Sequence, residues 1–387
     1  MNFVPFELFG ERMRDFISRS AGSFHPHHEP ERDADSEFNA LAIELFKLQY
    51  DSVSPYRTWC ESQGVKPSSV SHWSQIPAIP TAAFKDLELT CLPIEQRHAV
   101  FHSSGTTRHR PSRHWHNSMS LGLYEASLLA WFQPHLLPEH GREKSCSLRW
   151  LALTPPPNLA PRSSLVHMLG TVISRFGPGK AVFAGRPAAD NAWLLDIDSA
   201  CAMLDEAEVE NAPVCILTTA FHCVELASNL AERNKRIRLP LGSRLMETGG
   251  YKGRSREISK RELHDMVWDR LGITAEYSVS EYGMTELSSQ AYDWVAGKIR
   301  RSSSGVSHET ARCFRFPPWA RIQVISPETS RPVSHGETGF LRIFDLANVC
   351  SVMAVQTDDL VILRNHGFDF LGRKAGSEPR GCSLMAK

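Results

Sequence analysis

Charge of either sign is not in excess in this sequence: lysine and arginine together number 43, and so do aspartate and glutamate. A chain without net charge has no long-range field to attract nucleic acid or an anionic membrane, so no nucleic-acid partner is predicted. Long apolar runs are also missing. No stretch is long enough to span a bilayer, and charged residues among the first twenty interrupt any signal-peptide core, which favours a cytoplasmic protein.

The nine cysteines are an odd number and none of them forms a CxxC pair. A chain of 387 residues can bury a core without cross-links, so we expect reduced thiols rather than a disulfide framework. Fixed-period repeats and low-complexity tracts are absent, and no clean linker divides the chain.

Apolar residues recur at helical spacing in residues 36–50 and predict an amphipathic helix whose buried stripe is Phe38, Leu41, Ala42, Leu45 and Phe46. Residues 121–132 and 200–209 have compositions compatible with helices. Short apolar runs predict strands at 148–153, 214–217, 321–325, 340–344 and 360–363. Helices between strands indicate an α/β architecture.

A cluster of small hydroxyl residues surrounds one glycine and precedes three arginines: Ser103, Ser104, Gly105, Thr106 and Thr107, then Arg108, Arg110 and Arg113. Amides of a glycine turn and hydroxyl groups donate hydrogen bonds to phosphate oxygens, and arginines add charge-assisted donors. The Gly-Lys-Ser/Thr ending of a Walker loop is missing. Taken alone, the cluster is also typical of a polar surface loop.

A second segment, Tyr282-Gly283-Met284-Thr285-Glu286, supports a functional interpretation of this loop. Together the two resemble the adenylate-forming superfamily of acyl-CoA synthetases and their relatives. The resemblance implies that Ser103 to Thr107 hold ATP phosphates, that Tyr282 stacks on adenine, that Thr285 contacts the α-phosphate and that Glu286 binds Mg²⁺. For Glu286 the alternative is an ordinary surface glutamate.

Four further segments follow the superfamily's order. Thr248-Gly249-Gly250 resembles the strand end that lies against adenine, and residues 336–341 resemble its Gly-Glu-x-Gly turn. Asp359 stands where an aspartate holds the ribose hydroxyls. Arg373 stands in the hinge, where a contact with ribose or the adenylate and a structural salt bridge are both open.

Within that superfamily the sequence most resembles the LuxE-type acyl-protein synthetases, which activate fatty acids for a bacterial acid reductase. In that family a cysteine near the C-terminus is acylated, and Cys382 stands there. The resemblance implies ATP and Mg²⁺ as cofactors, a carboxylic acid as substrate, with a fatty acid as the family's expectation, and an acyl reductase, a carrier protein or coenzyme A as acceptor. The alternative for Cys382 is an idle thiol on an unstructured tail.

The fold expected from this resemblance is an α/β adenylate-forming large domain without the usual small C-terminal lid. We expect an N-terminal helical region over residues 1–90, an ATP- and acyl-binding body over 91–371 and a short arm over 372–387 that carries Cys382. Because few residues follow Arg373, a lid lysine is not expected, and the terminal arm would present its thiolate to the acyl-adenylate instead.

One departure from the family pattern lies in the phosphate loop. Arg108 stands where the family's phosphate loop commonly continues with glycine, which either adds a phosphate contact or restricts the loop. His114, His116 and His222 lie near aromatic residues, where histidines are more often structural, and they are not assigned to catalysis. Two other functions stay open: an acyl- or aryl-CoA ligase that uses coenzyme A directly, and a non-catalytic acyl carrier or scaffold.

Overall fold

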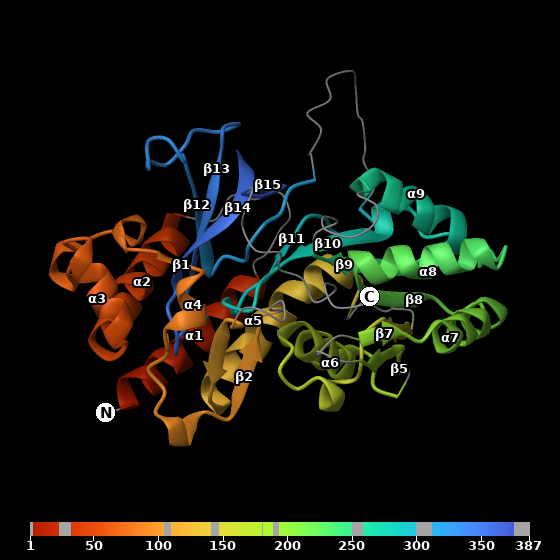
Figure 1. Cartoon of the computed structure of the whole chain (residues 1–387), viewed down its shortest axis with the longest axis horizontal. Coiled ribbons are helices and arrows are strands. Elements are labelled where there is room, and N and C mark those ends of the chain that lie inside the picture. Colours follow the sequence, from red (N-terminus) through yellow and green to blue (C-terminus); the bar gives the residue numbers. More distant parts are fainter. Residues whose placement is uncertain are drawn as a thin grey trace. The chain divides into compact units, whose positions relative to one another are not determined.

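The computed structural model describes residues 3–22, 32–103, 110–140, 147–179, 181–188, 193–249, 258–298 and 312–374 (Figure 1). These residues form two compact units, each assembled from separate stretches of the chain. The first unit contains the described residues up to Trp131, residues 283–291 and those from Cys313 onward. The second unit contains Phe132–Tyr282 and Tyr292–Arg312. Residues 1–90 therefore belong to the first unit, while residues 91–371 contribute to both.

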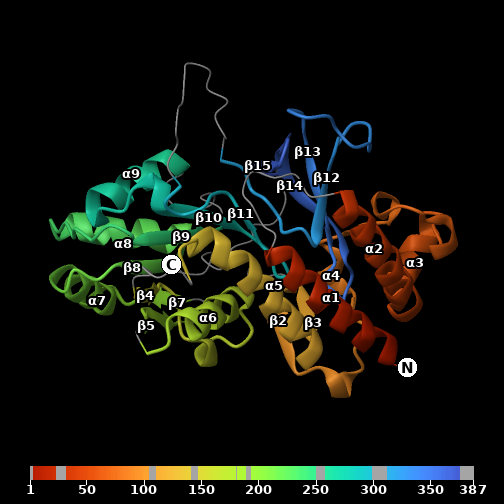
Figure 2. The same ribbon diagram turned by 180° about the vertical axis from the view of Figure 1, so that it is seen from behind.

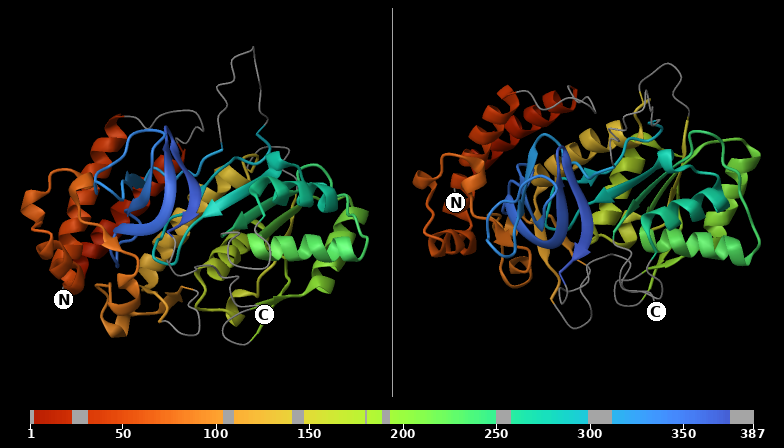
Figure 3. Two further views of the ribbon diagram at one scale, coloured as in Figure 1. Left: turned by 45° about the horizontal axis from the view of Figure 1, so that its top comes forward. Right: turned by 90° about the horizontal axis from the view of Figure 1, so that it is seen from above.

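The first unit is organised around a five-stranded sheet. Three long antiparallel strands lie in the order β14, β13, β12. The opposite edge of β14 pairs with β1 near its start, in parallel, and with β15 along its second half, antiparallel. Figure 3 shows how strongly the strands from residue 338 onward, in blue, curve. The strands are β1 (Ile79–Pro80), β12 (Ala320–Ile325), β13 (Thr338–Asp345), β14 (Ala354–Arg364) and β15 (Gly367–Arg373).

Four helices precede or follow β1 in this unit: α1 (Val4–Gly22), α2 (Arg32–Ser52), α3 (Ser54–Ser62) and α4 (Ala83–Asp86). All five residues of the predicted α2 stripe are buried, which confirms the helix and its apolar face. The Arg321 guanidinium of β12 lies 4.5 Å from the ring centre of Phe38 in α2. Figure 2 shows α1 beside α5 (Ser118–Leu136), where a Cβ on Gly10 would lie 2.7 Å from Met119 Sδ.

Helix α2 also fixes the loop between β13 and β14. Gln49 is fully buried, and its Nε2 donates to the carbonyl oxygens of Asn348, at 2.8 Å, and Val349, at 3.1 Å. Its Oε1 accepts a hydrogen bond from the Met353 amide at 3.0 Å. One amide side chain therefore satisfies three backbone groups that a buried loop would otherwise leave unpaired.

A two-stranded antiparallel hairpin leads into α5. It is formed by β2 (Ala99–His102) and β3 (Arg113–His116), so its connection contains the predicted phosphate loop. The described residues also contain short 3₁₀ helices at Pro67–Ser69, Trp73–Gln75, Ile94–Gln96, Pro157–Leu159 and Ala275–Tyr277.

The second unit contains a six-stranded sheet in the order β11, β10, β9, β8, β4, β5, in which β10 to β5 run parallel. A small antiparallel hairpin, β6 with β7, lies beside it. The strands are β4 (Arg149–Ala152), β5 (Ala181–Phe183), β6 (Gly185–Pro187), β7 (Trp193–Leu195), β8 (Val214–Thr219), β9 (Arg244–Thr248), β10 (Ser278–Tyr282) and β11 (Ala291–Tyr292).

Helices cover both faces of this parallel sheet, as an all-parallel arrangement requires. One face packs on α7 (Ile197–Val209), α8 (Ala220–Glu232) and α9 (Lys260–Leu271) around a continuous apolar cluster. On the other face, the Trp150 ring of β4 lies 6.5 Å from Phe132 of α5. Phe132 in turn lies 6.2 Å from Phe176, at the end of α6 (Ser164–Phe176).

The predicted strands and helices are all present in the described residues, most of them longer than their apolar cores. This confirms the α/β architecture. None of the helices in the described ranges is long and apolar enough to cross a membrane.

Candidate active site

Parallel strands β8, β9 and β10 place their carboxyl ends at one edge of the second unit's sheet. The register pairs Thr219 with Thr248, and Thr248 with Glu281. Ligands of open α/β sheets bind outside the carboxyl ends of such strands. Two candidate adenine-binding residues stand there: Gly249 directly follows β9, and Tyr282 is the last residue of β10.

Gly249 has the backbone geometry of a residue that a ligand approaches closely. Its φ is +90°, a left-handed conformation that favours glycine. Apart from Gly249 and its two chain neighbours, no heavy atom of the described residues lies within 4 Å of the position that a Cβ would take. A side chain at this position would be strained and would fill the space in front of the strand end.

Glu281 forms a buried polar pair with its cross-strand neighbour, since the Thr248 hydroxyl donates a hydrogen bond to its carboxylate. Burial raises the pKa of Glu281 to about 7, although the Thr248 hydrogen bond opposes the shift, and the charge of Glu247 adds to it. Glu247 itself accepts a hydrogen bond from the Ser280 hydroxyl. Because adjacent residues of a strand point to opposite faces, the two carboxylates lie on opposite sides of the sheet.

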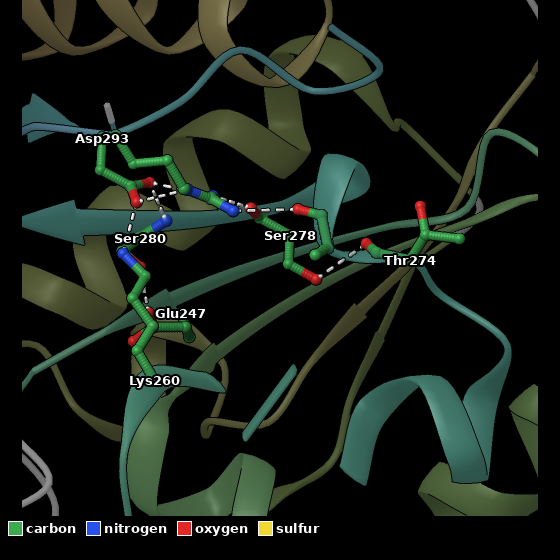
Figure 4. Close-up of polar contacts among 8 residues, drawn as sticks. Glu247, Lys260, Thr274, Ser278, Ser280 and Asp293 are labelled. Carbon is green, nitrogen blue, oxygen red and sulfur yellow. Dashed lines mark hydrogen bonds and ion pairs between the residues drawn. The ribbon is translucent and has the colours of Figure 1, made fainter. Parts of the chain in front are cut away.

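An ion cluster centred on Asp293 anchors β10 from the side (Figure 4). Its Oδ1 accepts the Ser280 amide at 2.7 Å, and its Oδ2 binds Lys260 Nζ and, at 2.9 Å, Arg312 Nε. Arg312 also donates to the carbonyl oxygens of Ser278 and, at 3.0 Å, Ala275. Burial alone would raise the pKa of Asp293, but the two cations together lower it.

The other half of the motif, Thr285 and Glu286, belongs to the first unit and forms the centre of a tight turn. The turn is closed by the Leu287 amide, which donates to the Met284 carbonyl at 3.1 Å. The carbonyls of its two central residues bind side chains from other elements. His114 Nδ1, on β3, lies 2.8 Å from the Thr285 oxygen, and Asn348 Nδ2 donates to the Glu286 oxygen at 2.9 Å.

His114 is buried, and burial lowers its pKa. The hydrogen bond to Thr285, the charge of Glu286 and a hydrogen bond with the Asn348 side chain each raise the pKa, but by less. The ring is therefore neutral at neutral pH. Because a carbonyl oxygen can only accept, the ring hydrogen is assigned to Nδ1. Glu286 is fully buried as well, so it is not the surface glutamate of the alternative reading.

The segment after the turn is held by one buried carboxylate, Asp345. It accepts hydrogen bonds from the Ser288 amide at 2.8 Å, the Ser289 hydroxyl at 2.7 Å and the Ala347 amide at 3.1 Å. Burial raises the pKa of Asp345, and these three donors partly reverse the shift. The motif is thus fixed at Thr285 by His114 of β3, at Glu286 by Asn348 of the β13–β14 loop, and beyond Glu286 by Asp345, the last residue of β13.

Asp359 and Arg373 are brought together in the first unit. They are register partners on β14 and β15, and Arg373 Nε donates to Asp359 Oδ1 at 2.9 Å. The salt bridge considered for Arg373 is therefore present, and its partner is the residue predicted to bind ribose. The ribose contacts of both residues stay a prediction.

Ser103 closes the β2–β3 hairpin at the base of the predicted phosphate loop. Its hydroxyl accepts the Ser112 amide at 2.8 Å, and its own amide donates to the Ser112 carbonyl at 3.1 Å. The hydroxyl hydrogen of Ser103 is not used by these bonds and can still point to a phosphate. The other predicted residues of the loop, and two more elsewhere, lie outside the described residues: Ser104, Gly105, Thr106, Thr107, Gly250 and Cys382.

Sequence reasoning missed His114, Asn348 and Asp293. His114 was interpreted as structural, and nothing in the sequence links it to a turn 171 positions away. Asn348 stands in an apolar stretch, where a lone amide gives no functional signal. Asp293 follows the motif closely, but its cations come from Lys260 and Arg312, which no short pattern connects.

The residues present fit ATP and Mg²⁺. Gly249 would leave space for a flat base, and the Glu286 carboxylate would offer the hard oxygen ligand that Mg²⁺ prefers. Among the described residues no group of three or more His, Cys, Asp or Glu is arranged to hold a metal.

No protein family model matches the sequence. A long-chain-fatty-acid–luciferin-component ligase of Aliivibrio fischeri is 20% identical over 341 residues, which cover 84% of this chain and 78% of that protein. An open conformation of 2-hydroxyisobutyryl-CoA ligase, in complex with 2-HIB-AMP and CoA, superposes with a TM-score of 0.62 at 12% identity. It covers 91% of this chain and 75% of that enzyme.

The chain has the fold of an adenylate-forming ligase. The same enzyme in its postadenylation state, with 2-HIB-AMP bound, gives the same TM-score and covers 91% of this chain and 73% of its own. The two comparisons bear out the adenylate-forming fold and the LuxE-type resemblance, since the ligase from Aliivibrio fischeri is similar over most of both chains.

Proposed function

We propose that this protein is an ATP-dependent acid–thiol ligase, which activates a carboxylic acid as acyl-AMP and then transfers the acyl group to the thiol of Cys382. One observation carries the proposal. An enzyme crystallised with an acyl-adenylate has a similar fold over 91% of this chain, and a fatty-acid ligase has a similar sequence over 84% of it. A fatty acid is therefore the first substrate class to test.

In the first step an oxygen of the substrate carboxylate attacks the α-phosphorus of ATP, and pyrophosphate leaves with the electron pair of the broken P–O bond. The carboxylate needs no general base, so the protein's task is to position the reactants and to compensate charge. Tyr282 and Gly249 would hold the base, Asp359 and Arg373 the ribose, and Thr285 the α-phosphate. When bound, Mg²⁺ would neutralise the charge of the leaving pyrophosphate, and Glu286 would be its ligand.

In the second step the thiolate of Cys382 attacks the acyl carbonyl carbon, and AMP leaves with the electrons of the mixed anhydride bond. The product is a thioester, and the thiol proton passes to solvent. A thiolate suits this step because it is a strong nucleophile. An acyl reductase, a carrier protein or coenzyme A would then accept the acyl group from Cys382.

The first experiment is acid-dependent exchange of labelled pyrophosphate into ATP, measured across a panel of aliphatic acids of increasing length and of aromatic acids. We expect exchange with at least one class and a hydroxamate when hydroxylamine is added. If no acid supports exchange or hydroxamate formation, and nucleotide binding is also undetectable, adenylation is not the function.

The second experiment separates the two steps with Cys382→Ser, which keeps the size of the side chain but removes its readily ionised nucleophile. We expect exchange at the wild-type rate and no protein-bound label from radioactive acid, whereas wild-type protein keeps label that neutral hydroxylamine releases. Equal labelling of both proteins would rule out Cys382 as the acyl acceptor.

A second candidate is a ligase that transfers the acyl group directly to coenzyme A. It is favoured by the presence of CoA in the structure of the similar 2-hydroxyisobutyryl-CoA ligase. Under this reading wild-type protein would consume coenzyme A without becoming labelled, and Cys382→Ser would form acyl-CoA as fast as wild type. The retention of a complete set of candidate residues argues against a third possibility, a non-catalytic carrier.

A further inference from the structure

We propose that His114 and Asn348 are positioning residues for adenylation: their hydrogen bonds to consecutive carbonyls fix the turn that presents Thr285 and Glu286. This inference rests on the proposed function for its catalytic meaning. The hydrogen bonds themselves do not depend on that function.

Two carbonyls of the turn accept hydrogen bonds from side chains that lie outside it. The bond that closes the turn joins the Met284 carbonyl to the Leu287 amide, and the carbonyls of Thr285 and Glu286 accept hydrogen bonds from other elements. His114 supplies the first at 2.8 Å and Asn348 the second at 2.9 Å. Both donors are buried, so they provide what water would otherwise provide.

The Thr285 carbonyl belongs to the central peptide of the turn, which sets the direction of the residues on either side. Type I and type II turns differ by a flip of this peptide, and type II requires a positive φ at the third residue, here Glu286. Among the described non-glycine residues only Asn211, Asn234 and Ser330 have a positive φ. His114 therefore holds the unflipped peptide. A flip would turn the Thr285 carbonyl away from its donor and reorient the Glu286 side chain.

The two donors reach the turn from separate parts of the first unit. His114 lies on β3, in the same hairpin as Ser103, and Asn348 lies in the loop that Gln49 of α2 fixes. One imidazole thus joins the β2–β3 hairpin, which Ser103 closes, to the turn that contains Thr285 and Glu286. Positioning errors of about 1 Å at a reacting centre can cost on the order of 100-fold in rate.

The test uses the full-length protein and two substitutions of His114. His114→Leu removes the donor, whereas in His114→Asn the amide nitrogen occupies the place of Nδ1 and can still donate. We expect His114→Leu to lower kcat for acid-dependent exchange roughly 10- to 100-fold with little change in KM for the acid. His114→Asn should stay within about threefold of wild type. Asn348→Asp, which cannot donate to the Glu286 carbonyl, should lower kcat to a similar extent as His114→Leu.

The matched control is His116→Leu. His116 lies on the same face of β3, is equally buried, and its ring is 4.2 Å from that of His114, but its Nδ1 faces Ser120 Oγ at 3.3 Å. It should lose comparable thermal stability and keep kcat. The proposal is overturned if His114→Leu loses no more kcat than this control, or if His114→Asn loses as much as His114→Leu.

A second measurement is independent of activity. In protein labelled with ¹⁵N-histidine, one ring whose signals vanish in His114→Asn should show the neutral tautomer with hydrogen on Nδ1. A hydrogen on Nε2 would refute the hydrogen bond to Thr285. Absence of exchange in wild type together with the expected ring spectrum would contradict the proposed adenylation but leave the turn's anchoring intact.

Discussion

Asp293 provides the sharpest test of what holds the second unit together. Its carboxylate is buried and binds Lys260, Arg312 and the Ser280 amide at once (Figure 4). In Asp293→Asn the amide oxygen can still accept the Ser280 hydrogen bond, so the substitution removes mainly the charge. Two cations then lie beside a neutral group, in a site arranged around an anion.

The size of the effect follows from burial. Removing one partner of a fully buried ion pair costs about 3–5 kcal/mol. The Lys260 side chain is 33% exposed and that of Arg312 is 16% exposed, so water can solvate both cations and reduce this cost. We therefore expect Asp293→Asn to lower the free energy of unfolding by about 2–3 kcal/mol. For a unit of this size, 1 kcal/mol corresponds to roughly 2–4 °C, so the unfolding transition should fall by about 4–12 °C.

Differential scanning calorimetry measures this shift, with Asp198→Asn as control. Asp198 also pairs with an arginine, Arg233, at 2.9 Å, but its own side chain is 84% exposed and that of Arg233 is 46% exposed, so a shift below 2 °C is expected. Because the folded pKa of Asp293 is lowered, its stabilisation is present above about pH 4 and is lost as the pH falls further. A shift below 2 °C in Asp293→Asn, or an equal shift in the control, would refute this account of the cluster.

Two other substitutions test the candidate site. Glu286→Gln should fold normally and lose acid-dependent exchange roughly 10- to 100-fold, because an amide is a poorer Mg²⁺ ligand than a carboxylate; wild-type rates would remove Glu286 from the metal site. Glu281 has a raised folded pKa of about 7, so its stabilisation is complete below about pH 4.5 and falls by up to about 3 kcal/mol as the pH rises through 7. Denaturant unfolding of Glu281→Gln should lack this decline, and an unchanged pH profile would exclude Glu281 as its source.

Strands with apolar sequences could be predicted, and strands with polar ones could not. All six residues of β8 are buried, and its apolar core was evident. Strands β9 and β10 are equally buried but carry Glu247, Thr248, Ser280 and Glu281. These residues satisfy one another across the two strands, and that pairing exists only after the strands have met.

Part of the candidate site could be predicted from the sequence, and part of it could not. The motif around Thr285 and Glu286 could be identified because its residues are consecutive and resemble a known family. The donors that fix it could not, because Asn348 and His114 lie 62 and 171 positions from the carbonyls they bind. Such partners are selected by packing of the folded chain, and a single sequence does not record which distant segments pack together.

The hydrogen bonds of Gln49 have a consequence for how the chain is made. Its partners lie 299, 300 and 304 positions later in the sequence. A ribosome that adds 5–20 residues per second needs about 15–60 s to synthesise that interval. During this time α2 has neither its loop partners nor Arg321 of β12, whose guanidinium lies over Phe38 of the apolar stripe. Nascent chains that stop before Met353 should therefore bind chaperones or aggregate through α2, even when the parallel sheet of the second unit is already complete.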